Sequence, residues 1–260
     1  MIRVVIFDLD GTLYRGEQPI EGAGAAVASL RAAGFRVLFL SNAGTNSRRE
    51  MAEKLQRLGV KAAAEEIYSS AYGAARYVLE KYGNGATYYA VAEKSMHDEL
   101  QSLGLVHSEQ QPKAVIISLD RHVTYDKLAK AYLLVRAGAE FIATNKDPEY
   151  PVENGFLPGA GSVVAAVETP LGFPPVLIGK PSTMLIDWML KDCNIKKSEV
   201  LIVGDALQTD IAVAKKAKIK SALVLTGIAT KKDLEKERKL KPDMVLASVK
   251  QLPAMLGITP

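Results

Sequence analysis

Short apolar runs rich in valine and isoleucine recur along this chain and alternate with amphipathic stretches. The runs lack strict polar alternation, which is typical of parallel strands that are covered on both faces. Helical periodicity lies between them, for example over 24–33 and over 47–58, where Gly59 follows as a C-cap. This alternation predicts an α/β fold with a doubly wound, Rossmann-like sheet between two layers of helices. The predicted strands are 4–7, 37–40, 115–117, 141–143, 176–178, 200–203 and 222–225.

The length of the chain leaves room for more than one structural unit. At roughly 150 residues per domain, 260 residues correspond to one large or two small domains. Two stretches rich in proline and glycine, 148–161 and 170–175, interrupt the alternation. We therefore expect one α/β core that is interrupted by an inserted α/β unit.

Composition excludes several classes of protein. With 48% hydrophobic and 24% charged residues the chain is typical of globular proteins, so disorder and a collagen-like structure are excluded. The net charge of +4 is spread along the chain, so we expect no nucleic-acid partner. The apolar run at residues 4–7 is too short for a signal peptide, and no segment reaches the roughly 18 apolar residues of a membrane span. We expect no contact with a membrane.

The cysteine and histidine content limits the metal chemistry. Cys193 is the only cysteine, so an internal disulfide and a cysteine zinc site are excluded, and a reducing cytoplasm is expected. The histidines, His97, His107 and His122, lack the spacing of zinc ligands. Any bound metal should therefore be held by oxygen ligands.

Two acidic motifs follow predicted strands. Asp8 and Asp10 stand directly after the strand 4–7, in the segment Asp-Leu-Asp-Gly-Thr, and Asp205 and Asp210 follow the strand 200–203. Two carboxylates so close together are costly unless a cation neutralises them. Taken singly, the first motif could be an acidic turn and Asp205 could be a helix N-cap.

Two further motifs also follow predicted strands. Ser41, Asn42 and Ala43 come after the strand 37–40, and Lys180 comes after the strand 176–178. Taken singly, the serine could be a helix cap and the lysine could face solvent. The carboxyl ends of parallel strands share one edge of a sheet, where open α/β proteins bind ligands. Carboxylates for a cation, with a hydroxyl, an amide and a lysine for phosphoryl oxygens, favour phosphoryl transfer.

In this order and spacing, the four motifs resemble those of the haloacid dehalogenase-like superfamily over nearly the whole chain. Two further segments, Ala-Thr-Asn-Lys-Asp at 143–147 and Pro-Gly-Ala-Gly-Ser at 158–162, resemble its class IIA branch, the 4-nitrophenylphosphatase-like phosphatases. The resemblance implies a catalytic core over 1–70 and 176–260 and an inserted α/β cap domain over 71–175. Within this insert, the polar and aromatic residues of the proline-containing loop 144–151, among them Asn145 and Asp147, favour a role in substrate selection, although the loop could instead only stabilise the junction between cap and core.

The resemblance assigns chemistry to the acidic residues. Asp8 would be the nucleophile that forms an aspartyl-phosphate. Asp10 would protonate the leaving oxygen and then activate water. Asp8, the carbonyl of Asp10 and Asp205 would hold Mg²⁺, and Asp210 would support them.

The resemblance also assigns residues to the phosphoryl group. Ser41 and the backbone around Asn42 and Ala43 would bind its oxygens. Lys180 would neutralise the charge that Asp8 and the phosphate share. Relatives of class IIA often pair through the cap, which implies a possible homodimer.

The function that these assignments imply is that of a Mg²⁺-dependent phosphatase of small phosphorylated metabolites. A phosphomutase of the same superfamily is an alternative. A phospho-accepting signalling receiver is another, but receivers need only about 120 residues, and their lysine follows the acidic residues, whereas Lys180 precedes Asp205. A non-catalytic binding protein is disfavoured because Asp8 and Asp10 are both present.

Overall fold

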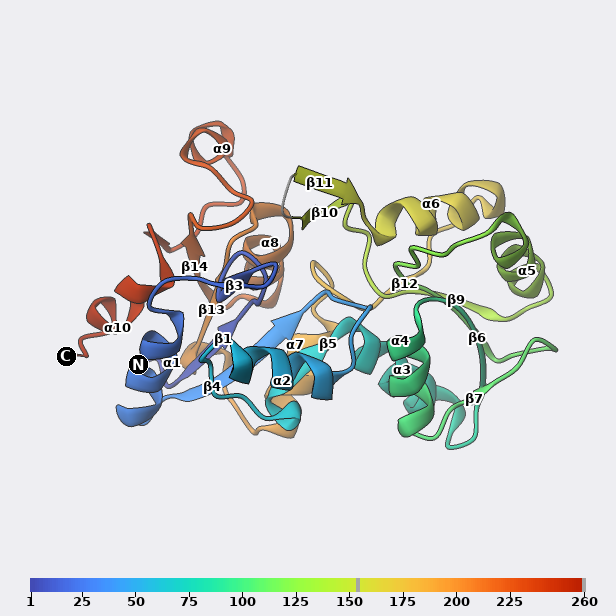
Figure 1. Ribbon diagram of the computed structural model, residues 1–260, viewed down its shortest axis with the longest axis horizontal. Coiled ribbons are helices and arrows are strands. Elements are labelled where there is room, and N and C mark those ends of the chain that lie inside the picture. Colours follow the sequence, from blue (N-terminus) through green and yellow to red (C-terminus); the bar gives the residue numbers. More distant parts are fainter. Residues whose placement is uncertain (153–154, 259–260) are drawn as a thin grey trace. The chain divides into compact units, whose positions relative to one another are not determined.

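The computed structural model describes residues 1–152 and 155–258 (Figure 1). The chain forms two compact units. The first comprises Met1–Ser41, Arg49–Tyr68 and Lys180–Pro260, and the second comprises Asn42–Arg48 and Ser69–Gly179. The second unit is therefore inserted in the sequence of the first as two segments.

The first unit is built on a six-stranded sheet. Its strand order is β15 (Met244–Leu246), β14 (Lys220–Val224), β13 (Val200–Gly204), β1 (Val4–Phe7), β4 (Arg36–Ser41) and β5 (Ile67–Ser69). The pairs from β15 through β4 are parallel. Every residue of β1 and β13 is buried, and successive side chains point to opposite faces, so both faces of the sheet are covered. This confirms the predicted three-layer parallel-sheet core.

Helices cover this sheet (Figure 1). Helix α1 (Ala23–Ala32) packs against β4, and α8 (Ala212–Ala217) packs against β14. A π-helical turn, Leu207–Ile211, leads directly from β13 into α8. The other helices of this unit are α2 (Arg48–Arg57), α7 (Met184–Asp192), α9 (Lys231–Lys236) and α10 (Leu252–Met255). A short antiparallel hairpin of β2 (Tyr14–Arg15) and β3 (Gln18–Pro19) follows β1.

The second unit has a sheet of its own. Its strand order is β12 (Val176–Leu177), β9 (Glu140–Ala143), β8 (Ala114–Ile117), β6 (Thr87–Val91) and β7 (Val106–His107), and all its pairs are parallel. Its helices are α3 (Ser70–Tyr82), α4 (Lys94–Ser102), α5 (Tyr125–Arg136) and α6 (Ala160–Leu171). The helices α5 and α6 contact each other. A hairpin of β10 (Glu149–Val152) and β11 (Gly155–Pro158) precedes α6.

One predicted strand belongs to a different sheet from the one we expected. Residues 176–178 contribute the strand β12, but β12 pairs with β9 in the second unit. The prediction that Lys180 follows a strand of the same sheet as Asp8 is therefore wrong. A short apolar run identifies a buried strand, but strand partners are chosen by contacts far away in the sequence, which the run itself does not encode.

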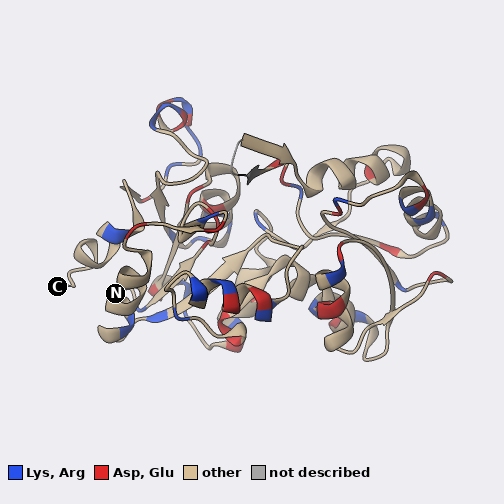
Figure 2. Ribbon diagram, viewed as in Figure 1, with Lys and Arg blue, Asp and Glu red and all other residues tan. Residues whose placement is uncertain are grey.

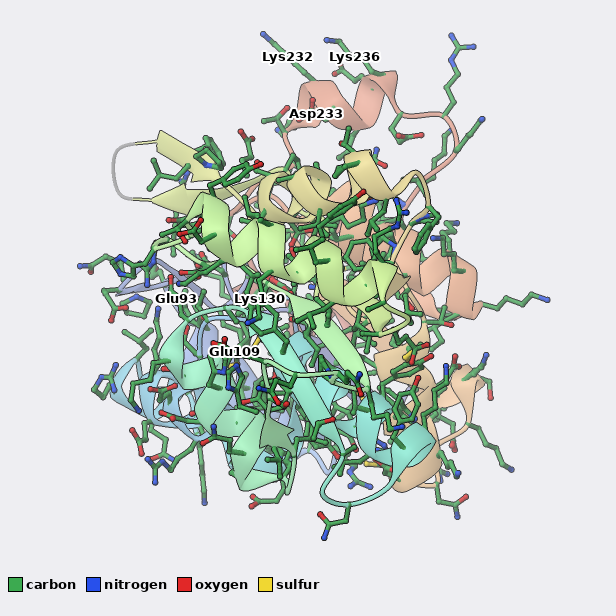
Figure 3. The ribbon with its side chains drawn as sticks, turned by 90° about the vertical axis from the view of Figure 1, so that its right-hand side faces the viewer. Glu93, Glu109, Lys130, Lys232, Asp233 and Lys236 are labelled. Carbon is green, nitrogen blue, oxygen red and sulfur yellow. The ribbon has the colours of Figure 1, made fainter. Side chains whose placement is uncertain are left out.

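No helix among the described residues is long and apolar enough to cross a membrane. Acidic and basic residues are interspersed along surface helices such as α2 and α9 (Figure 2). The side chains of Lys232 and Lys236 on α9 extend away from the sheet (Figure 3).

Candidate active site

Three of the predicted site residues stand where parallel strands of the first sheet end. Phe7 of β1 is level with Phe39 of β4 and with Val203 of β13, and the amide of Asp8 donates to the carbonyl of Val203 at 2.8 Å. Extending this register brings Ser41 and Asp205 level with Leu9, on either side of the Asp8–Asp10 segment. Neighbouring strands lie about 4.8 Å apart, so the sheet alone brings these residues together at its carboxyl edge.

Lys180 joins this edge from another part of the chain. Its Nζ donates to Asp8 Oδ1 at 2.5 Å and to Asp210 Oδ1 at 2.6 Å. All three residues are buried, and Lys180 is only 3% exposed. A buried ammonium between two carboxylates is stabilised only when both partners remain in place.

Burial dominates the electrostatics of this cluster. It raises the pKa of Asp8 well above its usual range, against the lowering effect of Lys180, and the charges of Asp210 and Asp205 raise it further. Burial acts to lower the pKa of Lys180, but the carboxylates of Asp210 and Asp8 outweigh it, so that pKa is raised and the side chain stays protonated. The excess of negative charge favours a cation beside Asp8.

Asp205 and Asp210 complete the acidic cluster. Carboxylate oxygens of Asp8, Asp205 and Asp210 all lie within 4.8 Å of one another. Burial, followed by the charge of Asp210, raises the pKa of Asp205 to about 7. Both oxygens of Asp210 are engaged, Oδ1 by Lys180 and Oδ2 by the amides of Asp205 and Ala206 at 3.2 and 3.0 Å. Asp210 is therefore arranged to hold its neighbours in place.

Asp10 has an orphaned oxygen. Its Oδ1 is buried and has no hydrogen-bond partner among the described residues. Burial raises the pKa of Asp10, while hydrogen bonds from the Gly16 and Gly11 backbones and the charge of Lys54 counteract part of that rise. An unsatisfied buried carboxylate oxygen is costly, so it is a position where a ligand or a transferred proton would be accommodated.

The remaining predicted residues gather within the second unit. The Nδ2 of Asn42 donates to both carboxylate oxygens of Asp147, at 3.2 and 3.0 Å. The carbonyl of Asn42 accepts from Asn145 Nδ2 at 2.8 Å and from Ser70 Oγ at 2.7 Å. Ala43 follows in the same segment and is half-buried. The structure thus joins Asn42 to Asn145 and Asp147, the two predicted cap-loop residues.

Two neighbours of the acidic motif were not predicted to take part in the site. Thr12 is buried, and its Oγ1 donates to Asp8 Oδ2 at 3.4 Å. Tyr14 is 7% exposed, and Lys54 Nζ lies 4.4 Å from the centroid of its ring. Burial and then the charges of Asp10 and Asp8 raise the pKa of Tyr14, which favours its protonated hydroxyl. The sequence feature that could have pointed to Tyr14 is its place four positions after Asp10.

A loop after β14 was also missed. Thr226 Oγ1 donates to the carbonyl of Gly11 at 2.6 Å, and the amide of Ile228 donates to Asp205 Oδ2 at 2.7 Å. The amide of Ala229 donates to the carbonyl of Asp205 at 2.9 Å. Thr226-Gly227 directly after a buried strand is the sequence signal that could have pointed to this loop.

A parallel sheet whose carboxyl edge gathers a buried lysine and several carboxylates is typical of enzymes that handle phosphoryl groups. Comparison with known families agrees with this class. A model described as haloacid dehalogenase-like hydrolase matches residues 5–106, and a second model of HAD-like hydrolases matches residues 177–252.

Individual relatives narrow the class. The acid sugar phosphatase of Staphylococcus saprophyticus is 36% identical over 236 residues, which cover 90% of this chain and 91% of that protein. The 4-nitrophenylphosphatase of Thermotoga maritima superposes with a TM-score of 0.92 at 31% identity, over 97% of both chains. A glycerol phosphate phosphatase of Mycobacterium tuberculosis, in complex with magnesium, superposes with a TM-score of 0.87 at 34% identity, over 96% of this chain and 76% of that one.

The chain belongs to the haloacid dehalogenase-like hydrolases, in the class IIA branch of phosphatases.

Proposed function

We propose that this enzyme hydrolyses small phosphate monoesters with Mg²⁺, through a covalent phosphoryl group on Asp8. The observation that carries the proposal is the position of Asp8, buried, joined to Lys180 and within 4.8 Å of two further carboxylates. A carboxylate that served only the fold would gain nothing from this excess of buried negative charge.

The proposed reaction has two steps. A carboxylate oxygen of Asp8 forms a bond to phosphorus while the bond from phosphorus to the ester oxygen breaks, and Asp10 gives its proton to that departing oxygen. Asp10, now ionised, then takes a proton from water, whose oxygen attacks phosphorus. The bond to Asp8 breaks, and inorganic phosphate and free Asp8 remain. The raised pKa of Asp10 supports its starting as the protonated acid.

Other groups would hold the transferred phosphoryl group. The ammonium of Lys180 already contacts Asp8 and would offset the charge that the carboxylate and the phosphate share. Ser41, buried at the end of β4, would donate its hydroxyl to a phosphoryl oxygen, together with backbone amides of Asn42 and Ala43.

The donor set suits a hard divalent cation. Asp8, the carbonyl of Asp10 and Asp205 offer only oxygens, and the buried, negatively charged cluster fits such an ion. We propose Mg²⁺ as that ion. We also propose that Asp210 holds Lys180 and the backbone of Asp205 in position through its hydrogen bonds to both. When bound, the cation supplies positive charge to the phosphoryl oxygens.

Substrate choice is proposed to reside in the inserted segment, taken as a cap over 71–175. Asp8, Asp10 and Lys180 recognise a phosphoryl group and a cation, but nothing in them distinguishes one alcohol from another. The names of relatives, for sugar phosphates and glycerol phosphate, suggest small polyol phosphates as substrates. Exchange of the loop 144–151 with that of a relative of different preference tests this proposal. A substrate ranking that stays with the core after the exchange would contradict it.

A homodimer that forms through the inserted unit is a further part of the proposal. Helix α5 buries few of its residues and exposes large apolar side chains, with Tyr125 82% exposed and Leu133 63% exposed. Lys130 on the same helix pairs with Glu109 at 2.7 Å (Figure 3), so polar groups border these side chains. Light scattering on the wild type and on Leu133→Glu tests the pairing. A wild type of monomeric mass would refute it.

We place the enzyme in the cytoplasm. The lone cysteine, Cys193, is half-buried and free, which suits a reducing compartment. Detection of the native protein in the cytosolic fraction of its source cells tests the placement, and recovery outside the cell would overturn it.

Phosphate release from a panel of phosphate esters tests the central proposal. Wild-type enzyme with Mg²⁺ should release inorganic phosphate continuously, and Asp8→Asn should not. A phosphomutase would instead move phosphate between positions of a sugar without net release. A receiver-like protein would accumulate a stable phospho-aspartate and turn over once. Either outcome would replace the phosphatase proposal.

A further inference from the structure

The loop that follows β14 is joined to two separate parts of the candidate site. We call residues 226–229 the β14 loop. Thr226 Oγ1 donates to the carbonyl of Gly11 at 2.6 Å, which connects the loop to the Asp8–Thr12 segment. Two amides of the loop, those of Ile228 and Ala229, donate to Asp205 at 2.7 Å (Oδ2) and 2.9 Å (backbone carbonyl). One short loop therefore binds both halves of the acidic cluster.

Gly11 and Gly227, which lie on opposite sides of the Asp205 carboxylate in space, make this arrangement possible. A Cβ on Gly227 or on Gly11 would overlap Asp205 Oδ2, and a Cβ on Gly11 would lie only 3.0 Å from Gly227 Cα. Gly11 also has a φ of +83°, a conformation that side chains disfavour. The Asp205 carboxylate is thus enclosed between two backbones, and its Oδ2 is occupied by the Ile228 amide.

These contacts lie at or next to two of the three groups that the proposed function assigns to the cation, the carboxylate of Asp205 and the carbonyl of Asp10. The hydrogen bond from Ile228 fixes the plane of the Asp205 carboxylate and leaves Oδ1 outside that bond. The hydrogen bond from Thr226 fixes the carbonyl of Gly11, one peptide beyond the carbonyl of Asp10, which is another of the assigned ligands. Groups that orient ligands in this way change metal affinity substantially without touching the metal.

We infer that Thr226 is a positioning residue for the cation site. Its hydrogen bond to the Gly11 carbonyl holds the Asp8–Thr12 segment against the β14 loop, which in turn orients Asp205. The inference rests on the proposed function for the identity of the ligands. It goes further because it assigns a role to a residue that lies outside the four motifs. A hydroxyl that served folding alone would change the stability of the metal-free protein and leave its metal affinity unchanged.

Mn²⁺ titration of EDTA-treated protein, followed by the electron paramagnetic resonance of the free ion, measures this role without catalysis. Asp205→Asn provides the background from other Mn²⁺ sites. Thr226→Val removes the hydroxyl at nearly constant shape, and we expect its dissociation constant for Mn²⁺ to rise about 10-fold or more. Thr226→Ser keeps a hydroxyl and should stay within about threefold of the wild type.

A matched control is available further along the same connection. Thr230 Oγ1 accepts from the amide of Asp233 at 3.3 Å and donates to Asp233 Oδ2 at 2.6 Å, at the start of α9. Thr230→Val therefore removes a threonine hydroxyl bond without loosening Gly11, and it should bind Mn²⁺ as the wild type does. The melting temperature of each variant in EDTA reports its effect on the fold.

Unchanged Mn²⁺ affinity in a folded Thr226→Val, or equal losses in Thr226→Val and Thr230→Val, would overturn the inference. Should Thr226→Val fail to fold, Gly227→Ala provides the second test, because its added Cβ displaces the Asp205 carboxylate and should also weaken Mn²⁺ binding. Unchanged affinity there would equally overturn the inference. Phosphate release by the wild type is scored separately, so a protein that binds Mn²⁺ through Asp205 but hydrolyses no ester would refute the proposed function alone.

Discussion

Lys180 Nζ lies 2.5 Å from Asp8 Oδ1, although 172 residues separate the two in sequence. The lysine reaches this position at the return from the second unit to the first, where Gly179 ends one unit and Lys180 begins the other. It also contacts Asp210, so a single buried ammonium joins segments from both ends of the chain.

Removal of the ammonium should therefore cost both stability and activity. Lys180→Met leaves Asp8 and Asp210 as buried carboxylates without their cation, and we expect a loss of about 3–5 kcal/mol in the free energy of unfolding near pH 7. Urea denaturation measures it. The double variant Lys180→Met/Asp8→Asn should recover part of the loss, because fewer buried charges remain. Equal stability of Lys180→Met and the wild type would show that the contacts of Lys180 with Asp8 and Asp210 contribute nothing to the free energy of unfolding.

Asp8→Asn should abolish turnover and preserve the fold. The amide is nearly isosteric but is a poor nucleophile, and we expect a fall of several orders of magnitude in kcat. Lys180 keeps Asp210 as a charged partner in this variant, so the protein should still fold, although loss of the ion pair with Asp8 should lower its melting temperature. Steady-state phosphate release together with circular dichroism measures both effects. Activity above about a tenth of the wild-type value would exclude Asp8 as the nucleophile.

Esters with different leaving groups test whether Asp10 protonates the departing oxygen. Asp10→Asn cannot deliver a proton, so we expect turnover of alkyl phosphates to fall by about 10²–10⁴-fold. The first step with 4-nitrophenyl phosphate should suffer less, because nitrophenolate leaves without a proton. Rapid-quench measurement of nitrophenol release resolves that step from later hydrolysis. Equal losses in the first step for both kinds of ester would argue against an acid at this position.

Metal removal should silence the enzyme reversibly. EDTA should abolish phosphate release and Mg²⁺ should restore it, because the assigned ligands are hard oxygens. Ca²⁺ should inhibit, since it favours higher coordination numbers and would engage Asp8 through both oxygens. Elemental analysis of the EDTA-treated protein provides the control. Full activity in a sample free of metal would remove the cation from the mechanism.

The second unit should lose stability in acid through His97. Its Nδ1 lies 3.1 Å from the hydroxyl of Tyr88, and its ring centroid is 5.4 Å from that of His107. Burial and then the charge of His107 lower the pKa of His97, so the folded state favours the neutral ring. The resulting stability is present above the unfolded pKa of about 6.5 and is lost as the pH falls below it.

Thermal unfolding between pH 7.5 and 5 measures this effect. In His97→Gln the melting temperature should decline less as the pH falls. In His122→Asn, at an exposed position, the decline should equal that of the wild type. Parallel declines in all three proteins would assign the acid sensitivity to other groups.

The sequence predicted the strands of the first sheet better than their partners. The runs at 4–7, 200–203 and 222–225 overlap β1, β13 and β14, because fully buried strands leave an unbroken apolar signal. The run at 176–178 was as apolar, yet its strand joined the other sheet. The strand β6 was missed altogether, since Thr87, Tyr88 and Tyr89 mix polar and aromatic character.

The chain alone determined which residues stand at strand ends. Asp8, Ser41 and Asp205 follow apolar runs directly, and the geometry of a parallel sheet then requires that they share an edge. Tertiary structure decided the rest. It brought Lys180 to Asp8 from the end of the inserted unit, turned Asn42 toward Asp147, and bound Thr226 to Gly11. These contacts depend on the side-chain and backbone positions of segments remote in sequence, whereas local periodicity records only whether a segment is buried and how it is wound.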